Sequence, residues 1–400
     1  MSALDPANAR LLALCERAAQ RTDALAPLRR AGRDAFAASG LPDTRREEWR
    51  YTSLAPLAAL DWASTGSPAP RIGARAGAEI FSTREAEAPP ALGELIDLKQ
   101  HPLAALATAL LDDAIVVRAP DGVAIDAPIE LTFLSAPAAR AEITLPRLHV
   151  EAERNSSLRL VVDHASAQPH GAHFTNAITE VVVGENASVE LTIVQRENDE
   201  TIHASTTAVR LARDARFTSR VVTLGGRLTR NDLAVLLAGE GAECTLDGLY
   251  LGSGERLVDN HSLVDHAVPH GASRQLYKGV LGGSSRGVFR GRVIVRPGAQ
   301  KTDAAQSNPN LLLSDGAEID TKPQLEIWAD DVKCSHGSAI GRLDQNALFY
   351  LRSRALGERD ARALLTQGFA AEILARLPSE ALREQLSAEF TRRVAAEARS

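Results

Sequence analysis

The spacing of apolar residues divides the chain into three regions. In the first hundred residues Leu11, Leu12, Cys15 and Ala19 recur at helical spacing, which predicts helices there. From about residue 114 short runs of Val, Ile, Leu and Thr replace this pattern and predict strands. Helical spacing returns after Arg354. The clearest predicted strands are 115–117, 129–133, 158–162, 178–183 and 189–194.

One short pattern repeats within the strand-rich region. A polar or small triplet precedes an apolar residue at Leu158, Val189, Phe217 and Cys244, which lie 27 to 31 residues apart, and 316–319 has a similar sequence. The helices that alternating β-α folds place between parallel strands are missing. A period of this length in an all-strand segment is typical of one coil of a β-solenoid. The predicted helical region, solenoid core and C-terminal helical hairpin are residues 1–112, 113–352 and 353–400.

The predicted C-terminal hairpin carries two apolar stripes, separated by Pro378 and Ser379. Stripes of this kind either cover the end of a solenoid or bind a partner protein, and the pattern alone does not choose between them. The first stripe is Ala361, Leu364, Leu365, Phe369 and Ile373, and the second is Leu382, Leu386, Phe390 and Val394.

Charge and cysteine content narrow the classes of function. The chain has 45 Lys and Arg against 51 Asp and Glu, a formal net charge of -6, which argues against nucleic acid as its main partner. Its three separated cysteines form neither a disulfide framework nor a zinc ribbon. The first residues do not resemble an export signal, and no apolar run is long enough to span a membrane. We therefore expect a cytoplasmic protein without a membrane partner.

Most short catalytic motifs are absent. The chain has no G-x-x-x-x-G-K-[ST] sequence, so we expect any ATPase activity to reside in another chain. One G-x-S-x-G string occurs at 283–287, but a strand-like sequence follows it instead of the helix of a nucleophile elbow, which favours a turn. Cys15 and Cys244 lie on apolar faces and are predicted core thiols.

Cys334 and His336 form the best candidate metal site. They are two residues apart, so on a strand both side chains point to the same side. A thiolate and an imidazole can share iron or zinc, and a structural role is the alternative. A second cluster, His261, His266 and His270, would need a turn to converge. Four arginines are separated by even numbers of residues, so on a strand their side chains point to the same side. They predict either a solvated face or an anion-binding ladder, and they are Arg286, Arg290, Arg292 and Arg296.

Five longer stretches of the sequence carry a recognisable pattern: 48–52, 273–278, 300–314, 320–337 and 348–354. They resemble the SufB/SufD family of iron–sulfur cluster assembly proteins. The stretch 332–337 has the SufD form of the family sequence. The resemblance implies a mainly β chain with a right-handed parallel β-helix core, flanked by N-terminal and C-terminal helical regions, in agreement with the predicted solenoid.

The same resemblance implies partners and a cargo. A SufD-type chain is a non-catalytic scaffold that pairs with SufB through the β-helix core, with a homodimer as a further possibility. It shares a transient iron–sulfur cluster at that interface, where the family's functional histidine corresponds to His336. Ser307 stands where SufB has a cysteine, so a soft ligand is expected from SufB. Docking of the SufC ATPase is expected on the C-terminal helices, at Arg354, Leu364, Leu365, Phe369 and Ile373.

Two other hypotheses compete with this one. The first is a β-solenoid enzyme acting on a polysaccharide or acyl donor, which is disfavoured because a six-residue repeat and a carboxylate and basic cluster are missing. The second is a purely structural partner, which differs from the scaffold only in the roles of Cys334 and His336.

Overall fold

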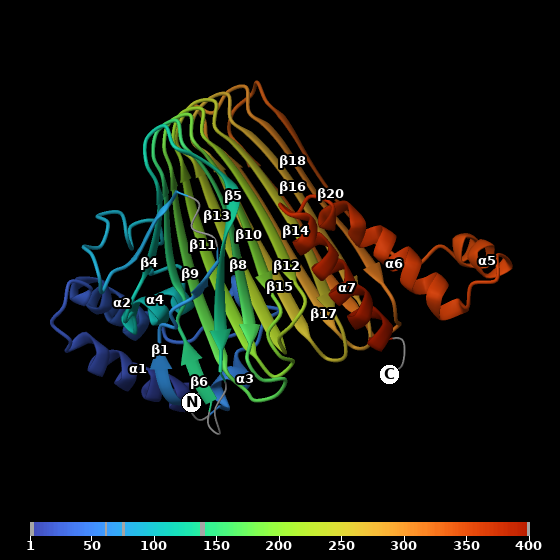
Figure 1. Cartoon of the computed structure of the whole chain (residues 1–400), viewed down its shortest axis with the longest axis horizontal. Helices are drawn as coiled ribbons and strands as arrows, with labels where there is room; N and C mark the ends of the chain where they lie inside the picture. Colours follow the sequence, from blue (N-terminus) through green and yellow to red (C-terminus); the bar gives the residue numbers. More distant parts are fainter. Residues whose placement is uncertain (1–3, 61, 74–76, 137–140, 398–400) are drawn as a thin grey trace.

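Two sheets face each other across the interior of a β-helix (Figure 1). The computed structural model describes residues 4–60, 62–73, 77–136 and 141–397. From β7 onward consecutive strands alternate between the sheets, so each coil contributes one parallel strand to each. The mainly β solenoid and all five of the clearest predicted strands are confirmed.

The strands of the β-helix form two sheets, A and B. Within the described ranges sheet A has eleven strands and sheet B has nine. Sheet A consists of β1 (Trp62–Gly66), β3 (Glu79–Ser82), β4 (Ile115–Ala119), β6 (Ala141–Thr144), β7 (Arg147–Ala152), β9 (Phe174–Val183), β11 (Ile202–Leu211), β13 (Leu228–Leu237), β15 (Leu257–His266), β17 (Arg286–Val295) and β19 (Glu318–Ile327). Sheet B consists of β2 (Arg71–Ile72), β5 (Ala124–Ser135), β8 (Ser157–Ser166), β10 (Ser188–Gln195), β12 (Arg216–Thr223), β14 (Glu243–Gly252), β16 (Ala272–Leu281), β18 (Asp303–Leu312) and β20 (Lys333–Gly341).

The sequence repeat marks the turns that lead into six strands of sheet B, from β8 to β18. The first residue of the repeated triplet has a positive φ, a conformation that Asn, Asp and Gly tolerate best. In later coils a histidine and a lysine take the same position. The residues are Asn155 (56°), Asn186 (54°), Asp214 (55°), Gly241 (72°), His270 (59°) and Lys301 (61°).

The apolar residue of each repeat lies in one column inside the solenoid. Leu158 pairs in register with Val189, Val189 with Phe217, and Phe217 with Cys244. These side chains belong to the hydrophobic core between the sheets, as the stacked coil predicts. The similar sequence at 316–319 precedes β19 and therefore belongs to sheet A, outside this column.

The N-terminal region covers the outer face of sheet A. Its helices bury apolar side chains against Phe174, Ile178 and Ile202. Short strands β1 to β3 accompany the predicted helices, and β2 and β3 pair antiparallel with β5 and β4 at the first coil. The helices are α1 (Asp5–Ala19), α2 (Ala26–Ser39), the 3-10 helix η1 (Glu47–Trp49), α3 (Ala55–Ala58) and α4 (Pro102–Ala109).

The C-terminal helices are α5 (Gln345–Ser353), α6 (Glu358–Leu374) and α7 (Glu380–Glu397). The α6–α7 hairpin lies across the outer face of sheet B, while α5 projects away from the solenoid (Figure 1). Its stripes bury Ile373 and Phe390 against sheet B residues such as Leu249, so the hairpin covers a side of the solenoid and not its end. The division into regions at 112/113 and 352/353 stays a prediction. Across the described ranges, every helix is too short or too polar to cross a membrane.

Candidate functional site

The last coil of the solenoid is open. β19 and β20 are the terminal strands of sheets A and B in the described chain, so one edge of each carries unpaired backbone N–H and C=O groups. Large apolar side chains are exposed on this coil: Ile327 (40%), Trp328 (57%) and Ile340 (53%). At the opposite end, the antiparallel strands β2 and β3 pair with the first coil and cover part of its edge. The two ends therefore differ in their capacity to pair with another chain.

Cys334 occupies the inward column on this open coil. Register pairs continue from Cys244 through Ser273 and Ala304 to Cys334. The Cys334 side chain is half-buried and packs against the main core. Loss of hydration raises the pKa of its thiol, so the protonated form prevails at neutral pH. Extending the sequence repeat by three coils would have placed this residue in the column.

His336 lies two residues further along β20, on the same inward side. Its register partner is Gln306 in β18, which in turn pairs with Gln275 in β16. Because no coil follows β20, His336 is exposed while Gln306 is buried. The structure thus brings Cys334 and His336 to one side of one strand, as predicted, and leaves the imidazole accessible.

This pair is not a complete metal centre. Within the described ranges no group of three or more His, Cys, Asp and Glu side chains is arranged to hold a metal ion. A half-buried thiol and an exposed imidazole supply at most part of a ligand set for iron or zinc.

The predicted docking residues on the C-terminal helices differ widely in exposure. Arg354 is exposed and Leu364 is 47% exposed. Leu365 and Phe369 are half-buried against the core under the hairpin, and Ile373 is fully buried. Two residues that the sequence analysis did not single out are more exposed than any of the apolar ones. They are Phe349 (75%) and Tyr350 (63%), both on α5.

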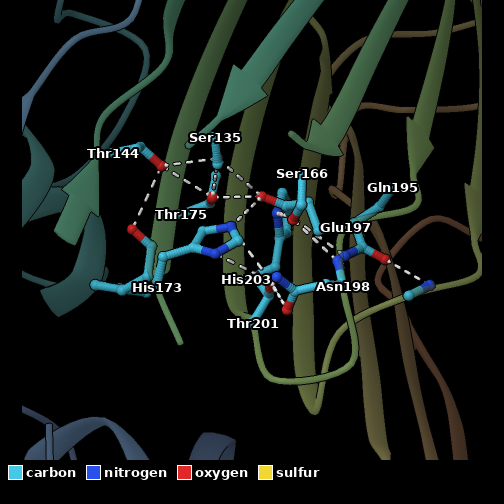
Figure 2. A network of polar contacts seen from close by, with 12 residues as sticks. Ser135, Thr144, Ser166, His173, Thr175, Gln195, Glu197, Asn198, Thr201 and His203 are labelled. Carbon is cyan, nitrogen blue, oxygen red and sulfur yellow. Dashed lines mark hydrogen bonds and ion pairs between the residues drawn. The ribbon is translucent and has the colours of Figure 1, made fainter. Parts of the chain in front are cut away.

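A buried polar network fills the corner between sheets B and A (Figure 2). Glu197, directly after β10, accepts hydrogen bonds from His203 Nδ1 (2.6 Å), His173 Nε2 (3.2 Å) and Thr175 Oγ1 (2.5 Å). Burial opposes the charged carboxylate, but His203 and His173 outweigh it and hold the pKa of Glu197 well below its ordinary value. Burial, with His203 nearby, lowers the pKa of His164 to about 3.

This network was missed by the sequence analysis because its members come from different coils. One signal was available, since His164 and Gln195 are register partners one coil apart. Ser135 also donates to Glu197, while Thr201 donates to Asn198 and the hydroxyls of Thr144 and Thr175 contact each other at the edge of the corner (Figure 2). The network joins the two sheets and leaves the buried His203 Nε2 without a hydrogen-bond partner among the described residues.

The family-like stretch at 48–52 attaches the N-terminal region to the solenoid. The Arg230 guanidinium lies 3.8 Å from the centre of the Trp49 ring. Arg230 also donates to Asp259 at 2.8 Å, and Thr52 donates to the same carboxylate at 2.5 Å. Burial opposes this negative charge, but His261 and Arg230 lower the pKa of Asp259 to about 2. This stretch therefore has a structural role.

The predicted histidine cluster does not converge on one site. His261 lies on the outer face beside Asp259, with 2.9 Å between Nε2 and Oδ1. His266 points inward and contacts Ser273 Oγ at 2.9 Å, and His270 occupies a turn. His261 and His266 therefore lie on opposite sides of β15.

The predicted arginine ladder is neutralised by carboxylates, which favours the solvated face over an anion site. The ion pairs are Arg286 with Asp320 (2.6 Å), Arg290 with Glu47 (2.8 Å), Arg292 with Glu326 (2.5 Å) and Arg296 with Asp265 (2.7 Å).

Two further sequence predictions concern core and turn residues. Cys15 and Cys244 are buried free thiols, and burial raises the pKa of each to about 12, as expected for core residues. In the 283–287 string Ser285 is buried and donates to the Gly282 carbonyl at 2.7 Å. The string is a turn before β17, which confirms the prediction.

Comparison with known proteins identifies the family. Residues 134–369 match the family model described as the SufBD core domain of the SUF system for FeS cluster assembly. The chain belongs to the SufBD family. An iron–sulfur cluster assembly SufBD family protein of Synechocystis is 33% identical over 90% of this chain and 88% of its own length.

Two relatives are named as the iron–sulfur cluster assembly protein SufD. The Escherichia coli protein is 36% identical over 60% of this chain and 56% of its own length. The Bacillus subtilis protein is 28% identical over 75% of this chain and 68% of its own length. These similarities support a SufD-type subunit with a role in iron–sulfur cluster assembly.

Proposed function

We propose that this chain is the scaffold subunit of an ATP-driven, cytoplasmic iron–sulfur cluster assembly complex, in which it pairs with SufB and docks the SufC ATPase. The observation that carries the proposal is the open last coil with Cys334 and His336 on its inner side. A second solenoid placed against β19 and β20 would satisfy their free edges. It would also cover the exposed Trp328 and Ile340.

The cluster is the cargo of this interface and not a resident cofactor. His336 would contribute a neutral imidazole, which is a borderline ligand for iron. Cys334 would contribute less, because its half-buried thiol is protonated at neutral pH. Ser307, the register neighbour of Gly337, carries a hydroxyl on the exposed side of β18. The stronger thiolate ligand is therefore assigned to SufB, and the cluster would be held only when both chains are present.

SufC would dock on the side of the C-terminal helices that faces away from sheet B. Phe349 and Tyr350 on α5 and Leu364 on α6 are exposed, and apolar patches of this kind mark protein–protein contacts. Arg354 lies at the C-terminal cap of α5 and is exposed as well. The deeper residues Leu365, Phe369 and Ile373 would support this surface from below.

In this proposal the chain transmits a conformational change from SufC to the interface with SufB and catalyses no reaction itself. ATP binding would close the SufC dimer and strain the SufB–SufD pair, exposing interface ligands that include His336. Since β20 leads through Gly341 into α5 within a few residues, a displacement of α5 acts directly on the strand that carries His336. A homodimer through the same open coil is the alternative assembly.

The test is co-purification of this chain with SufB and SufC, followed by iron and sulfide analysis after anaerobic reconstitution. His336→Ala is expected to leave the complex assembled and to lower cluster content about tenfold, the size of effect typical of lost ligand or outer-shell groups. His270→Ala is the matched control, because His270 is exposed in a turn of sheet B. Full cluster content in His336→Ala, or a chain that does not co-purify, would overturn the proposal. Loss of assembly in His336→Ala would make His336 structural.

A further inference from the structure

The side chain of Gln306 has an unmet hydrogen-bond acceptor directly beside His336. The two residues are register partners on the parallel strands β18 and β20, and strand alternation places both on the inward side. Gln306 is only 4% exposed. Its Oε1 is buried and has no hydrogen-bond partner among the described residues. Because buried acceptors in proteins are nearly always satisfied, this atom points to a donor that belongs beside it.

A chain of amides gives this acceptor its direction. Gln275 Nε2 donates to Ser262 Oγ, and Gln306 Nε2 donates to Gln275 Oε1 at 2.6 Å. Each amide thus donates toward the earlier coil, and the oxygen of Gln275 faces the later one. The oxygen of Gln275 accepts from its register partner in the next coil. By the same arrangement, the oxygen of Gln306 is directed toward its own register partner in the next coil, His336.

The opposite sheet leaves room for this amide. A Cβ atom at Gly291 in β17 would lie 1.9 Å from Gln306 Nε2 and 2.7 Å from Gln306 Cδ. The Gln306 side chain therefore crosses the interior and fills the space beside Gly291. Gln275 and Gly291 together fix the amide, so its free oxygen is held in place on the inner side of the open coil.

We infer that Gln306 is a positioning residue for His336: when the exposed His336 side chain turns toward it, Gln306 Oε1 accepts a ring N–H, which leaves the other ring nitrogen unprotonated and directed to the open end. The inference rests on the proposed function of His336 and specifies how the imidazole is prepared for a metal. Acceptors that bind the far nitrogen of a metal-ligating histidine fix its tautomer and ring orientation. The ligand class served is a borderline metal such as ferrous iron.

The test is the tautomer of His336, read from the ¹⁵N shifts of both ring nitrogens in the full-length chain labelled at histidine. The buffer is held near about pH 8.5, where ordinary imidazoles are neutral, and the His336→Asn spectrum assigns the signals. One tautomer is expected to prevail by roughly five- to tenfold in the wild type, the size of one hydrogen bond. Gln306→Met is expected to remove this preference, and Gln306→Glu, which keeps an acceptor, to retain it.

A control separates this effect from a general loss of stability. Gln195→Met removes another buried amide, in β10, far along the solenoid from the open coil, and is expected to leave the His336 signals unchanged. The same tautomer ratio in wild type and Gln306→Met would overturn the inference. A changed ratio in Gln195→Met would overturn it as well.

Cluster content distinguishes the inference from the function on which it rests. If Gln306→Met leaves the tautomer unchanged while His336→Ala still lowers cluster content in the complex, the positioning role is wrong and the proposed function stands. If Gln306→Met changes the tautomer while His336→Ala retains full cluster content, the hydrogen bond is supported and the proposed function is overturned.

Discussion

His203 Nδ1 lies 2.6 Å from Glu197 Oε2 in a corner of the solenoid where both side chains are fully buried. Glu197 has left its strand and His203 has just entered the next one, so their contact joins sheet B to sheet A. A buried carboxylate is tolerated only when its oxygens are satisfied. The short corner between β10 and β11 therefore depends on this contact.

Replacement of Glu197 by Gln is expected to lower the free energy of unfolding by on the order of 3 kcal/mol, because charge-assisted hydrogen bonds from His203 and His173 are lost in a buried site. Urea unfolding at neutral pH measures the difference. Glu200→Gln, an exposed carboxylate in the same corner, is the control and is expected to change stability by less than about 0.5 kcal/mol. Equal effects of the two variants would contradict the prediction.

Stability is expected to fall as the pH drops from about 7 to about 5. The pKa of His164 is about 3 in the folded chain, through burial and the nearby His203, against an ordinary value of 6.5. Below pH 6.5 the unfolded chain binds a proton that the folded chain does not, so folding becomes less favourable until the folded pKa is reached. Between about pH 7 and about pH 5, His164 alone is expected to lower the free energy of unfolding by about 2 kcal/mol.

The variant His164→Leu checks this pH dependence. The His164 ring stacks on Phe133 and its Nδ1 has no hydrogen-bond partner among the described residues, so an apolar replacement is expected to be tolerated at pH 7. Urea midpoints at both pH values are expected to show a weaker pH dependence than the wild type. Part of the dependence stays, because burial also lowers the pKa of His266 to about 4. An unchanged pH dependence would argue against His164 as its source.

Gly225→Ala is expected to lower the free energy of unfolding by at least about 2 kcal/mol. A Cβ at Gly225 would lie 2.1 Å from the carbonyl oxygen of Glu197, a backbone atom that has no room to move. Gly298→Ala is the matched control, because a Cβ there meets nothing within 4 Å. Thermal unfolding of both variants measures the difference, and similar melting temperatures would show that the coils relax more easily than their packing indicates.

Two exposed aromatic residues are expected to separate the two proposed partners. Phe349→Ser on α5 is expected to weaken retention of SufC by tenfold or more, on the order of an interface hot spot, and to leave SufB bound. Trp328→Ser on the open coil is expected to do the reverse. Because the side chains are 75% and 57% exposed, neither change is expected to alter the stability of the isolated chain beyond about 0.5 kcal/mol. Pull-down of each partner is the measurement, and loss of both partners in either variant would contradict the assignment.

Local chemistry made much of the solenoid predictable. The triplets that begin at Asn155, Asn186 and Asp214 mark the left-handed turn residue and the inward residue of each coil. The sequence at 316–319 resembles the repeat but leads into a strand of sheet A, so it does not share the column. The short strands β1 to β3 were missed because two to five residues in a Ser- and Gly-rich stretch carry little periodicity.

Four features were predictable from the amino-acid sequence: the β-solenoid, its period, the side of β20 that carries Cys334 and His336, and the likeness to the SufBD family. These features depend on alternation along a strand and on turn residues a few positions apart, which act locally. Three other features emerge from the folded chain: the last coil is open, Phe349 and Tyr350 are exposed while Ile373 is covered, and Glu197 accepts hydrogen bonds from several donors in one corner. Those features depend on which coil or helix covers a given side chain. Contacts between residues tens to hundreds of positions apart determine which element that is.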